Sequence, residues 1–167
     1  MTLERINKLG LLEAQNEFIG CCYCERWATE LTNLRPFASI EELFEKADST
    51  WASATEDERL EAFSGHPQIG DMKALRNKYA ANANREQGQI EEAKDSVLLA
   101  LRDGNLRYLE SNGFIFIVCA TGKSADEMLG LLQDRLRNDR ETELDNAARE
   151  QGAITRLRLQ KLVEEEV

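Results

Sequence analysis

The stretch "GFIFIVCATG", residues 113–122, decides between an all-helical fold and a mixed one. It is almost continuously apolar and rich in aromatic and β-branched residues, and its length fits either a buried strand or a core helix. A single strand would find no partner elsewhere in this sequence. We therefore expect a buried helix or an extended segment inside an all-α fold, with Gly113 and Gly122 as stops or turns.

The chain on both sides of this segment favours helices. Only 2 prolines occur in 167 residues, and β-branched runs are few. Thr55 with Glu58, and Ser124 with Glu127, have the spacing of capping boxes. Helices are expected over 2–33, 39–48, 55–64, 71–81, 85–102, 104–111, 124–137 and 140–163. This pattern predicts one compact domain over residues 1–167, built from about eight helices around the apolar segment.

Composition excludes several classes of function. The 42% of hydrophobic residues suffice for one core, and 31 acidic against 21 basic residues give a net charge of −10. Such a charge repels nucleic acid and anionic lipid surfaces. No run approaches about 18 uninterrupted apolar residues, and the N-terminus is charged from its first turn, so neither a signal peptide nor a membrane span is expected. The chain is predicted to be a soluble cytoplasmic protein without nucleic-acid or membrane partners.

The four cysteines are Cys21, Cys22, Cys24 and Cys119, three of them crowded into four positions. This spacing is poor for a disulfide framework and typical of a reducing compartment. With His66 they offer a zinc site as the less favoured alternative, because no second C-x-x-C element is present. Buried free thiols and no bound metal are expected.

The sequence "ATGKS", residues 120–124, resembles the end of a phosphate-binding loop. The first glycine of that motif would fall at position 117, which is Ile117, so the backbone cannot wrap a phosphate. A helix-capping role for Ser124 explains the same residues, and a nucleotide site is rejected.

The single histidine lies in "AFSGHPQIGD", residues 62–71. Pro67 biases the backbone of His66 toward an extended conformation and fixes the direction in which the chain leaves the preceding helix. An imidazole held in this way suits proton transfer, because its ordinary pKa lies near neutrality. The alternative is a turn residue that only interacts with the helix dipole.

The last predicted helix separates two arginines. At about 100° per residue, its apolar stripe is centred near 340° when Leu144 is set to 0°. The residues that define this stripe are Leu144, Ala148, Ile154 and Leu162. Arg158 falls within it at about 320°, whereas Arg156 falls at about 120° on the opposite face. An arginine on the stripe either snorkels to water, pairs with a buried carboxylate or binds an anionic ligand.

Glu86 has a comparable position at the start of the helix expected over 85–102. Ile90, Ala93 and Val97 fall within about 40° of it, so Glu86 opens the apolar face near the positive end of the helix dipole. A glutamate in a first turn is also a common helix-start residue, and the sequence leaves both interpretations open.

These motifs together resemble the 2-oxo-4-hydroxy-4-carboxy-5-ureidoimidazoline (OHCU) decarboxylase family. The similarity covers nearly the whole chain, and it is the order and spacing of the pieces that make it specific. They are "RPFASIEEL" (35–43), "LEAFSGHPQIGD" (60–71), "REQ" (85–87), "GFIFIVCATGKSADEML" (113–129), "RLRN" (135–138) and "EQGAITRLRLQKL" (150–162).

The resemblance implies an all-α, homodimeric enzyme without a cofactor, which decarboxylates OHCU to (S)-allantoin during urate degradation. We take His66 and Glu86 as the acid/base pair. Substrate-binding positions implied by the family are Pro67, Ala83, Asn84, Arg85, Glu86, Gln87, Phe116, Val118, Cys119, Ala120, Thr121, Gly122 and Arg158. Many members have a serine where this chain has Ala83, so a main-chain group or Asn84 is expected to replace that contact.

Two other classes of function remain open at this stage. A related lyase or tautomerase acting on another ureide would use the same residues. A non-enzymatic helical interaction module would explain the helices and the acidic surface, but it gives no reason for His66, Glu86 and Arg158 to face a common interior.

Overall fold

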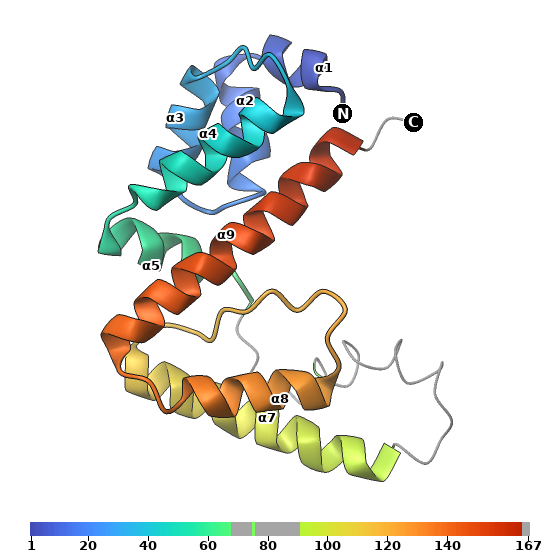
Figure 1. Cartoon of the computed structure of the whole chain (residues 1–167), viewed down its shortest axis with the longest axis vertical. Coiled ribbons are helices and arrows are strands. Elements are labelled where there is room, and N and C mark those ends of the chain that lie inside the picture. The colour runs from blue at the N-terminus through green and yellow to red at the C-terminus, as the bar shows by residue number, and fades with distance from the viewer. Residues whose placement is uncertain (68–74, 76–90, 165–167) are drawn as a thin grey trace. The chain divides into compact units, whose positions relative to one another are not determined.

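Every regular element that the structure describes is a helix. The computed structural model describes residues 1–67, 75 and 91–164, drawn in colour in Figure 1. Within them lie eight helices: α1 (Leu3–Lys8), α2 (Leu11–Ile19), α3 (Glu25–Asn33), α4 (Ile40–Ala52), α5 (Glu56–Ser64), α7 (Glu91–Asn112), α8 (Ala125–Arg135) and α9 (Arg140–Glu164). The predicted all-α fold is confirmed. None of these helices combines the length and apolarity needed to cross a bilayer.

The apolar segment that decided the fold is irregular between Gly113 and Gly122. It forms neither a helix nor a strand, so of the two expected alternatives the core helix is absent and a segment without regular structure runs through the all-α fold. Both glycines have positive φ, 78° and 76°, a region that other residues rarely adopt, which makes them the turns predicted at the two ends. Phe114, Phe116 and Ile117 are buried.

The helix expected over residues 2–33 is three helices. Gly10 is the N-cap of α2, and Gly20 is its C-cap, where the chain turns before α3 begins at Glu25. Glycine destabilises a helix interior by about 1 kcal/mol relative to alanine, so the two glycines are natural breaks that the periodic pattern concealed.

At Gly104 the prediction placed a break where the structure has none. The sequence predicted a break between 102 and 104, but α7 runs through this position. A Cβ atom at Gly104 would lie only 2.6 Å from Leu132 Cδ2, so the glycine allows α7 and α8 to pack closely. Tertiary packing has therefore outweighed the weak helix propensity of glycine.

Other predicted boundaries agree more closely with the structure. The capping box at Thr55 and Glu58 is present, and Ser124 accepts a hydrogen bond from the Glu127 amide as the N-cap of α8. The helix expected over 39–48 continues to Ala52, and that over 140–163 matches α9 within one residue. The predicted helix 71–81 and the start of the one at 85–102 lie outside the described residues, apart from helical Leu75.

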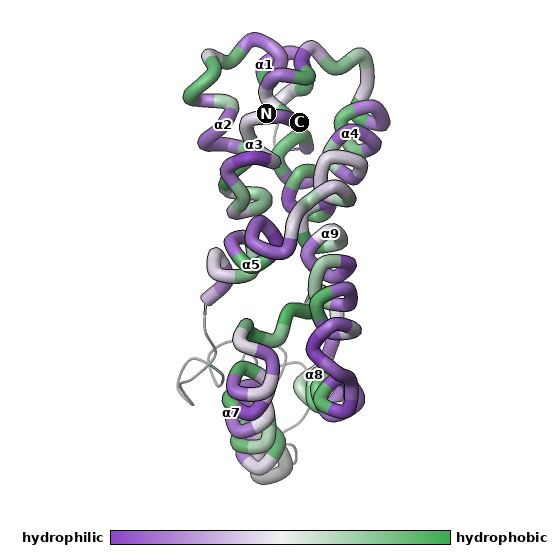
Figure 2. Tube along the Cα trace, turned by 90° about the vertical axis from the view of Figure 1, so that its left-hand side faces the viewer, coloured by the Kyte–Doolittle hydropathy of each residue, from purple (hydrophilic) through white to green (hydrophobic). Residues whose placement is uncertain are grey.

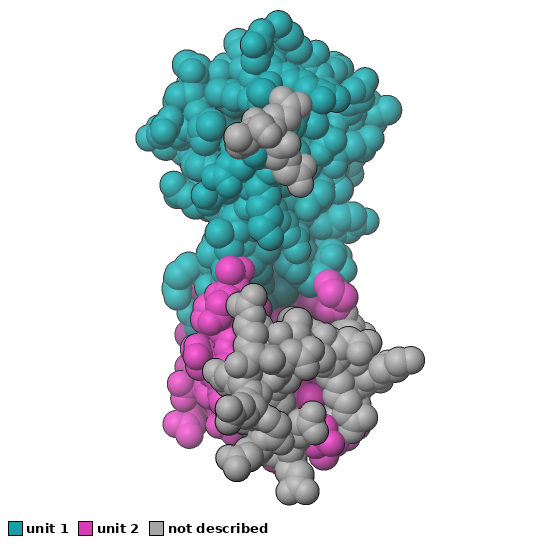
Figure 3. All heavy atoms as spheres, turned by 90° about the vertical axis from the view of Figure 1, so that its right-hand side faces the viewer, with its two compact units in different colours: residues 1–66, 117–119, 146–167 teal, residues 67–116, 120–145 magenta. Residues whose placement is uncertain are grey.

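The chain divides into two compact units, coloured in Figure 3. Unit 1 comprises residues 1–66, 117–119 and 146–167, and unit 2 comprises residues 67–116 and 120–145. Along the helices of both units, hydrophilic and hydrophobic residues alternate, which Figure 2 shows as purple beside green. That residues 1–167 act as one domain stays a prediction.

Unit 1 is organised by two buried tryptophans. The indole N–H of Trp27 donates to the carbonyl of Ala47 at 3.0 Å, which ties α3 to α4. The indole N–H of Trp51 donates to the carbonyl of Ala148 at 2.8 Å and ties α4 to α9. These bonds satisfy the one polar atom of each ring, so both rings can be buried without an unpaired donor. The bond from Trp51 also fixes the part of α9 that belongs to unit 1, which carries Arg158.

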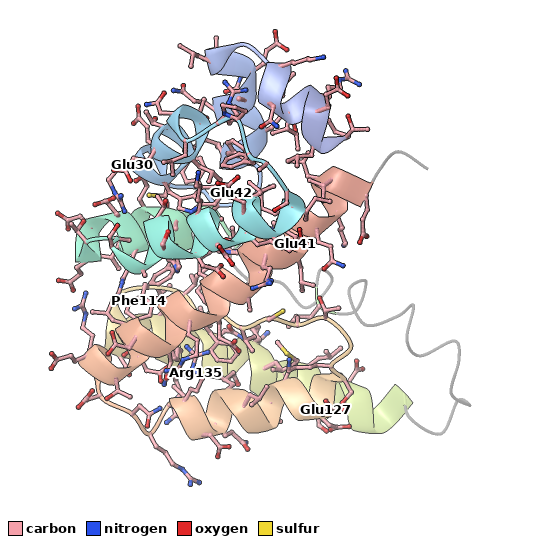
Figure 4. All side chains as sticks on the ribbon, turned by 45° about the horizontal axis from the view of Figure 1, so that its top comes forward. Glu30, Glu41, Glu42, Phe114, Glu127 and Arg135 are labelled. Atoms are coloured by element: carbon pink, nitrogen blue, oxygen red, sulfur yellow. The ribbon has the colours of Figure 1, made fainter. Side chains whose placement is uncertain are left out.

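Unit 2 contains an ionic cluster, which we define as Tyr108, Arg135, Asn138 and Glu143, and all of these but Asn138 are buried. Glu143 is fully buried, and its Oε1 accepts from Arg135 Nε at 2.7 Å and from the Tyr108 hydroxyl at 2.5 Å. Its Oε2 accepts from Asn138 Nδ2 at 2.8 Å. The guanidinium of Arg135, labelled in Figure 4, also lies 4.8 Å from the ring centre of Phe116. Burial, reinforced by the bond to Glu143, raises the pKa of Tyr108 well above its ordinary value.

Candidate active site

The position of His66 is set by the preceding residue, Gly65, which packs closely against Tyr23. Helix α5 ends at Ser64, Gly65 is its C-cap, and the His66 amide donates to the Phe63 carbonyl at 3.2 Å. A Cβ atom added to Gly65 would lie 2.4 Å from Tyr23 Cβ, which is closer than real Cβ atoms approach. Only glycine fits here, and the chain therefore delivers the half-buried imidazole in a set direction.

The imidazole is held by a buried amide. His66 Nε2 lies 2.5 Å from Oε1 of Gln151, a fully buried side chain on α9. Gln151 Nε2 donates to Thr155 Oγ1 at 3.1 Å, and the Thr155 hydroxyl is hydrogen-bonded to the Cys22 thiol group. We call these four residues the Gln151 chain. It leads from the interior of unit 1 to the one histidine of the sequence.

Burial lowers the pKa of His66 from its ordinary value near 6.5. Removal of the ring from water is the largest cause, the bond to Gln151 acts in the opposite direction, and the positive charge of Arg158 adds to the lowering. The imidazole is therefore neutral at physiological pH. In that form it has one protonated nitrogen and one nitrogen that can accept a proton.

The neighbouring thiols are not candidates for nucleophilic attack. Burial raises the pKa of Cys21 and Cys22 to about 12, so both remain protonated near neutrality. The predicted buried free thiols are confirmed for Cys21, Cys22 and Cys24, whereas Cys119 is only half-buried. In the part of the chain that the structure describes, no group of three or more histidine, cysteine or acidic side chains has a metal-binding arrangement.

Arg158 is exposed although it falls on the buried face of α9. The buried positions of this helix are Glu143, Leu144, Ala147, Ala148, Gln151, Thr155 and Leu159, and on the same wheel they extend from about 260° through 0° to about 60°. At about 320°, Arg158 falls between Ala147 and Gln151, and its exposed side chain corresponds to the alternative in which the arginine of the stripe reaches water. Its Nη1 contacts the carbonyl of Cys21 at 3.4 Å, and its charge reaches His66.

Arg156 falls at about 120° on the wheel, outside the range of the buried positions. It is exposed, lies 3.3 Å from the Asp48 carboxylate and stands over the ring of Phe44 at 5.0 Å. Both arginines are exposed, so a different role for each stays a prediction.

The remaining predicted site residues are distributed as follows. Val118 and Cys119 belong to unit 1 with His66 and are half-buried. The other described positions belong to unit 2: Phe116 is buried, Ala120 is half-buried, and Pro67, Thr121 and Gly122 are exposed. Five positions lie outside the described residues, namely Ala83, Asn84, Arg85, Glu86 and Gln87.

Sequence reasoning missed Gln151 and Thr155. The signal was available, because Gln151 falls at about 340° on the helical wheel, at the centre of the predicted apolar stripe. A buried amide at such a position must satisfy both its oxygen and its nitrogen, and here it does so with His66 and Thr155.

These features define a small all-helical protein in which a neutral, half-buried imidazole is held by a buried amide. The model of the OHCU decarboxylase family matches residues 7–160. The chain belongs to the OHCU decarboxylase family.

Individual relatives agree with this assignment. The chain is 34% identical over 151 residues to a bifunctional uric acid degradation protein of Arabidopsis thaliana, a match that covers 89% of this chain and 47% of that protein. Two bacterial bifunctional relatives are matched over 33% and 26% of their length, so the chain spans half or less of these three proteins. A Haloferax volcanii 2-oxo-4-hydroxy-4-carboxy-5-ureidoimidazoline decarboxylase is 23% identical, with 95% of this chain and 94% of that protein covered.

A solved structure supports both the fold and the family. The crystal structure of an OHCU decarboxylase, obtained in the presence of (S)-allantoin, is 33% identical to this chain with a TM-score of 0.74. The match covers 90% of this chain and 99% of that one.

Proposed function

We propose that this protein decarboxylates OHCU to (S)-allantoin in the degradation of urate. The observation that carries the proposal is the neutral imidazole of His66, aimed by Gly65 and held by Gln151, in a chain of this family. The relative crystallised in the presence of (S)-allantoin supports the choice of product.

The substrate itself contains the electron acceptor that the reaction needs. Its carboxylate leaves a carbon adjacent to a ring C=N bond, so the electron pair released with CO2 flows into that bond. Loss of CO2 makes a C=C bond between the hydroxyl-bearing carbon and the former C=N carbon. The protein then has to orient the substrate, accept the hydroxyl proton as that carbon becomes a carbonyl, and deliver a proton to one face of the former C=N carbon. The electron sink that pyridoxal or thiamine cofactors provide elsewhere is already present, and we propose that the enzyme works without a cofactor or metal.

We assign the proton transfers to His66 and Glu86. Neutral His66 can accept the hydroxyl proton, while exposed Arg158 on α9 supplies positive charge for an anionic edge of the substrate. Gln87 and the backbone of 118–122 are proposed to bind the ureido and ring amides, with Pro67, Phe116 and the 83–85 segment as further substrate-binding positions. The alanine at position 83 removes one family hydrogen bond, which Asn84 or a main-chain group is proposed to replace.

The proposal extends to the state of the protein. We propose a homodimer that acts on a small ureidoimidazoline in the cytoplasm, with residues 1–167 working as one domain. The net charge of −10 supports the exclusion of nucleic acid and anionic membrane surfaces as partners.

The decisive experiment generates the unstable substrate from urate in situ and follows the optical activity of allantoin. Enzyme-dependent formation of the (S)-enantiomer supports the proposal, whereas racemic allantoin at the uncatalysed rate overturns it. Turnover of another ureide alone, in a substrate panel with chiral product analysis, would instead identify a related lyase or tautomerase. Activity should survive exhaustive EDTA treatment and dialysis, and loss of activity together with a stoichiometric metal would contradict the cofactor-free mechanism.

A further inference from the structure

The hydrogen bonds of Gln151 distinguish the two ends of its amide. Its Nε2 lies 3.1 Å from Thr155 Oγ1, and its Oε1 lies 2.5 Å from His66 Nε2. An amide oxygen only accepts, so the His66 nitrogen facing it must carry the proton of the neutral ring.

The next contact completes this arrangement. Thr155 Oγ1 lies 3.1 Å from Gln151 Nε2, and a hydroxyl oxygen accepts from an amide N–H. A flipped amide would instead present its N–H to His66 Nε2 and would require the opposite tautomer of the ring, so the two orientations lead to different, measurable states of His66.

From this geometry we infer that Gln151 is a positioning residue that holds His66 in its Nε2–H tautomer and leaves Nδ1 as the proton-accepting atom. The lone pair on Nδ1 follows from this tautomer itself, because a neutral imidazole that carries its proton on Nε2 accepts at the other nitrogen. The tautomer assignment depends on unit 1 alone, and only its catalytic consequence rests on the proposed function. Gln151 acts through the ring and needs no contact with the substrate.

The single histidine makes the tautomer directly measurable in the full chain. Nitrogen-15 NMR of the one imidazole, at a pH where the ring is neutral, should show a protonated Nε2 and an unprotonated Nδ1. The Nε2 proton should exchange slowly with solvent because Gln151 accepts it inside the protein. A protonated Nδ1 as the main species, or a rapidly exchanging Nε2 proton, would overturn the assignment.

Variants test whether the Gln151 chain determines the tautomer of His66. Gln151→Leu should abolish the slow exchange of the Nε2 proton and make the Nδ1–H tautomer detectable. Thr155→Val keeps the side-chain shape but removes the acceptor of the Gln151 amide, and it should move the spectrum in the same direction. Thr155→Ser retains the hydroxyl and should restore the wild-type spectrum, while Gln160→Leu, at an exposed position of α9, is the matched control. An unchanged His66 spectrum in folded Gln151→Leu and Thr155→Val would contradict the inference.

Turnover separates positioning from structure. Gln151→Leu should lower kcat about tenfold with KM within about twofold, because loss of one oriented hydrogen bond affects the reacting ring more than substrate contacts. If the spectra change as expected while no variant or wild type turns over OHCU, the proposed function fails and the tautomer assignment stands. If kcat is unchanged in a variant whose tautomer has changed, the positioning role is wrong although the enzyme assignment survives.

Discussion

Two fully buried polar side chains on α9, Glu143 and Gln151, belong to networks of opposite kind. They lie eight positions apart in the sequence, roughly two helical turns. Glu143 is charged, and both of its oxygens accept hydrogen bonds from the ionic cluster of unit 2. Gln151 is neutral, and its chain in unit 1 ends on the half-buried ring of His66.

The difference separates a structural network from one that serves a reactive group. The carboxylate of Glu143 accepts from Tyr108 and Arg135 at one oxygen and from Asn138 at the other, so both of its oxygens are satisfied within the network. The Gln151 chain, in contrast, holds a ring whose second nitrogen faces outward from the network. Disturbing the first network should cost stability, and disturbing the second should cost turnover.

The largest expected effect is on the stability of the ionic cluster. Glu143→Gln removes the charge that compensates Arg135 in a buried site, and it should lower the free energy of unfolding by about 3–5 kcal/mol. Urea denaturation of wild type and variant measures this difference. Glu141→Gln makes the same charge change at an exposed position of α9 and should cost about 1 kcal/mol or less. Equal losses would show that the cluster is not the structural network described.

His66→Asn should act in the opposite way. The fold should remain intact, because the ring is half-buried at a helix end, whereas kcat should fall at least about a hundredfold. Turnover of in situ generated OHCU, measured beside circular dichroism, tests both statements. Near-normal turnover in a folded variant would remove the histidine from the mechanism.

Much of the fold was accessible from sequence because capping and periodicity are local. Thr55 and Ser124 are N-cap residues that indicate where α5 and α8 begin, and the bounds of α9 were predicted from its helical pattern. The errors at Gly10, Gly20 and Gly104 have one cause. A glycine in a helical pattern ends a helix or permits close helix packing, and the partner that decides, such as Leu132 against Gly104, is distant in sequence.

The site was predictable to a smaller extent. His66 is conspicuous as the one imidazole beside a proline, and the resemblance to a family identified Arg158. Gln151 was missed because a neutral amide on an apolar stripe has no charge that would mark it as unusual, unlike the guanidinium of Arg158. The exposure of Arg158 was not predictable from the wheel, because ideal periodicity gives the face of a helix and not which positions other elements cover.

Two exposed arginines on α9, Arg158 and Arg156, allow a matched test of substrate binding. Arg158→Lys should lower kcat/KM about tenfold, because lysine cannot reproduce a planar contact with an anionic edge of the substrate. Arg156→Lys should have little effect, since its partners Asp48 and Phe44 lie on the other flank of α9. Both variants keep the positive charge, so the comparison isolates geometry. A larger loss at position 156 would show that the wrong arginine has been assigned to the substrate.

The smallest expected effect is a pair of opposite slopes in stability against pH. The folded-state pKa of His66 lies below its ordinary value near 6.5 because the ring is buried. Between these two values the unfolded chain binds a proton that the folded chain does not, so stability falls as the pH is lowered through that window. Tyr108 has a pKa raised by burial, so above pH about 10 the unfolded chain loses a proton that the folded chain keeps, and stability falls as the pH rises.

The acid dependence of stability should disappear in a variant without His66, and the alkaline dependence in a variant without Tyr108. Subtracting the unfolding free energy of His66→Asn from that of wild type isolates the acid slope, which is at most about 1.4 kcal/mol per pH unit. The same subtraction with Tyr108→Phe isolates the alkaline slope and cancels the many surface carboxylates that titrate in both proteins. If His66→Asn left the acid slope of wild type unchanged, the folded and unfolded chains would bind the His66 proton equally, and burial by the Gln151 chain would not control the charge of the ring.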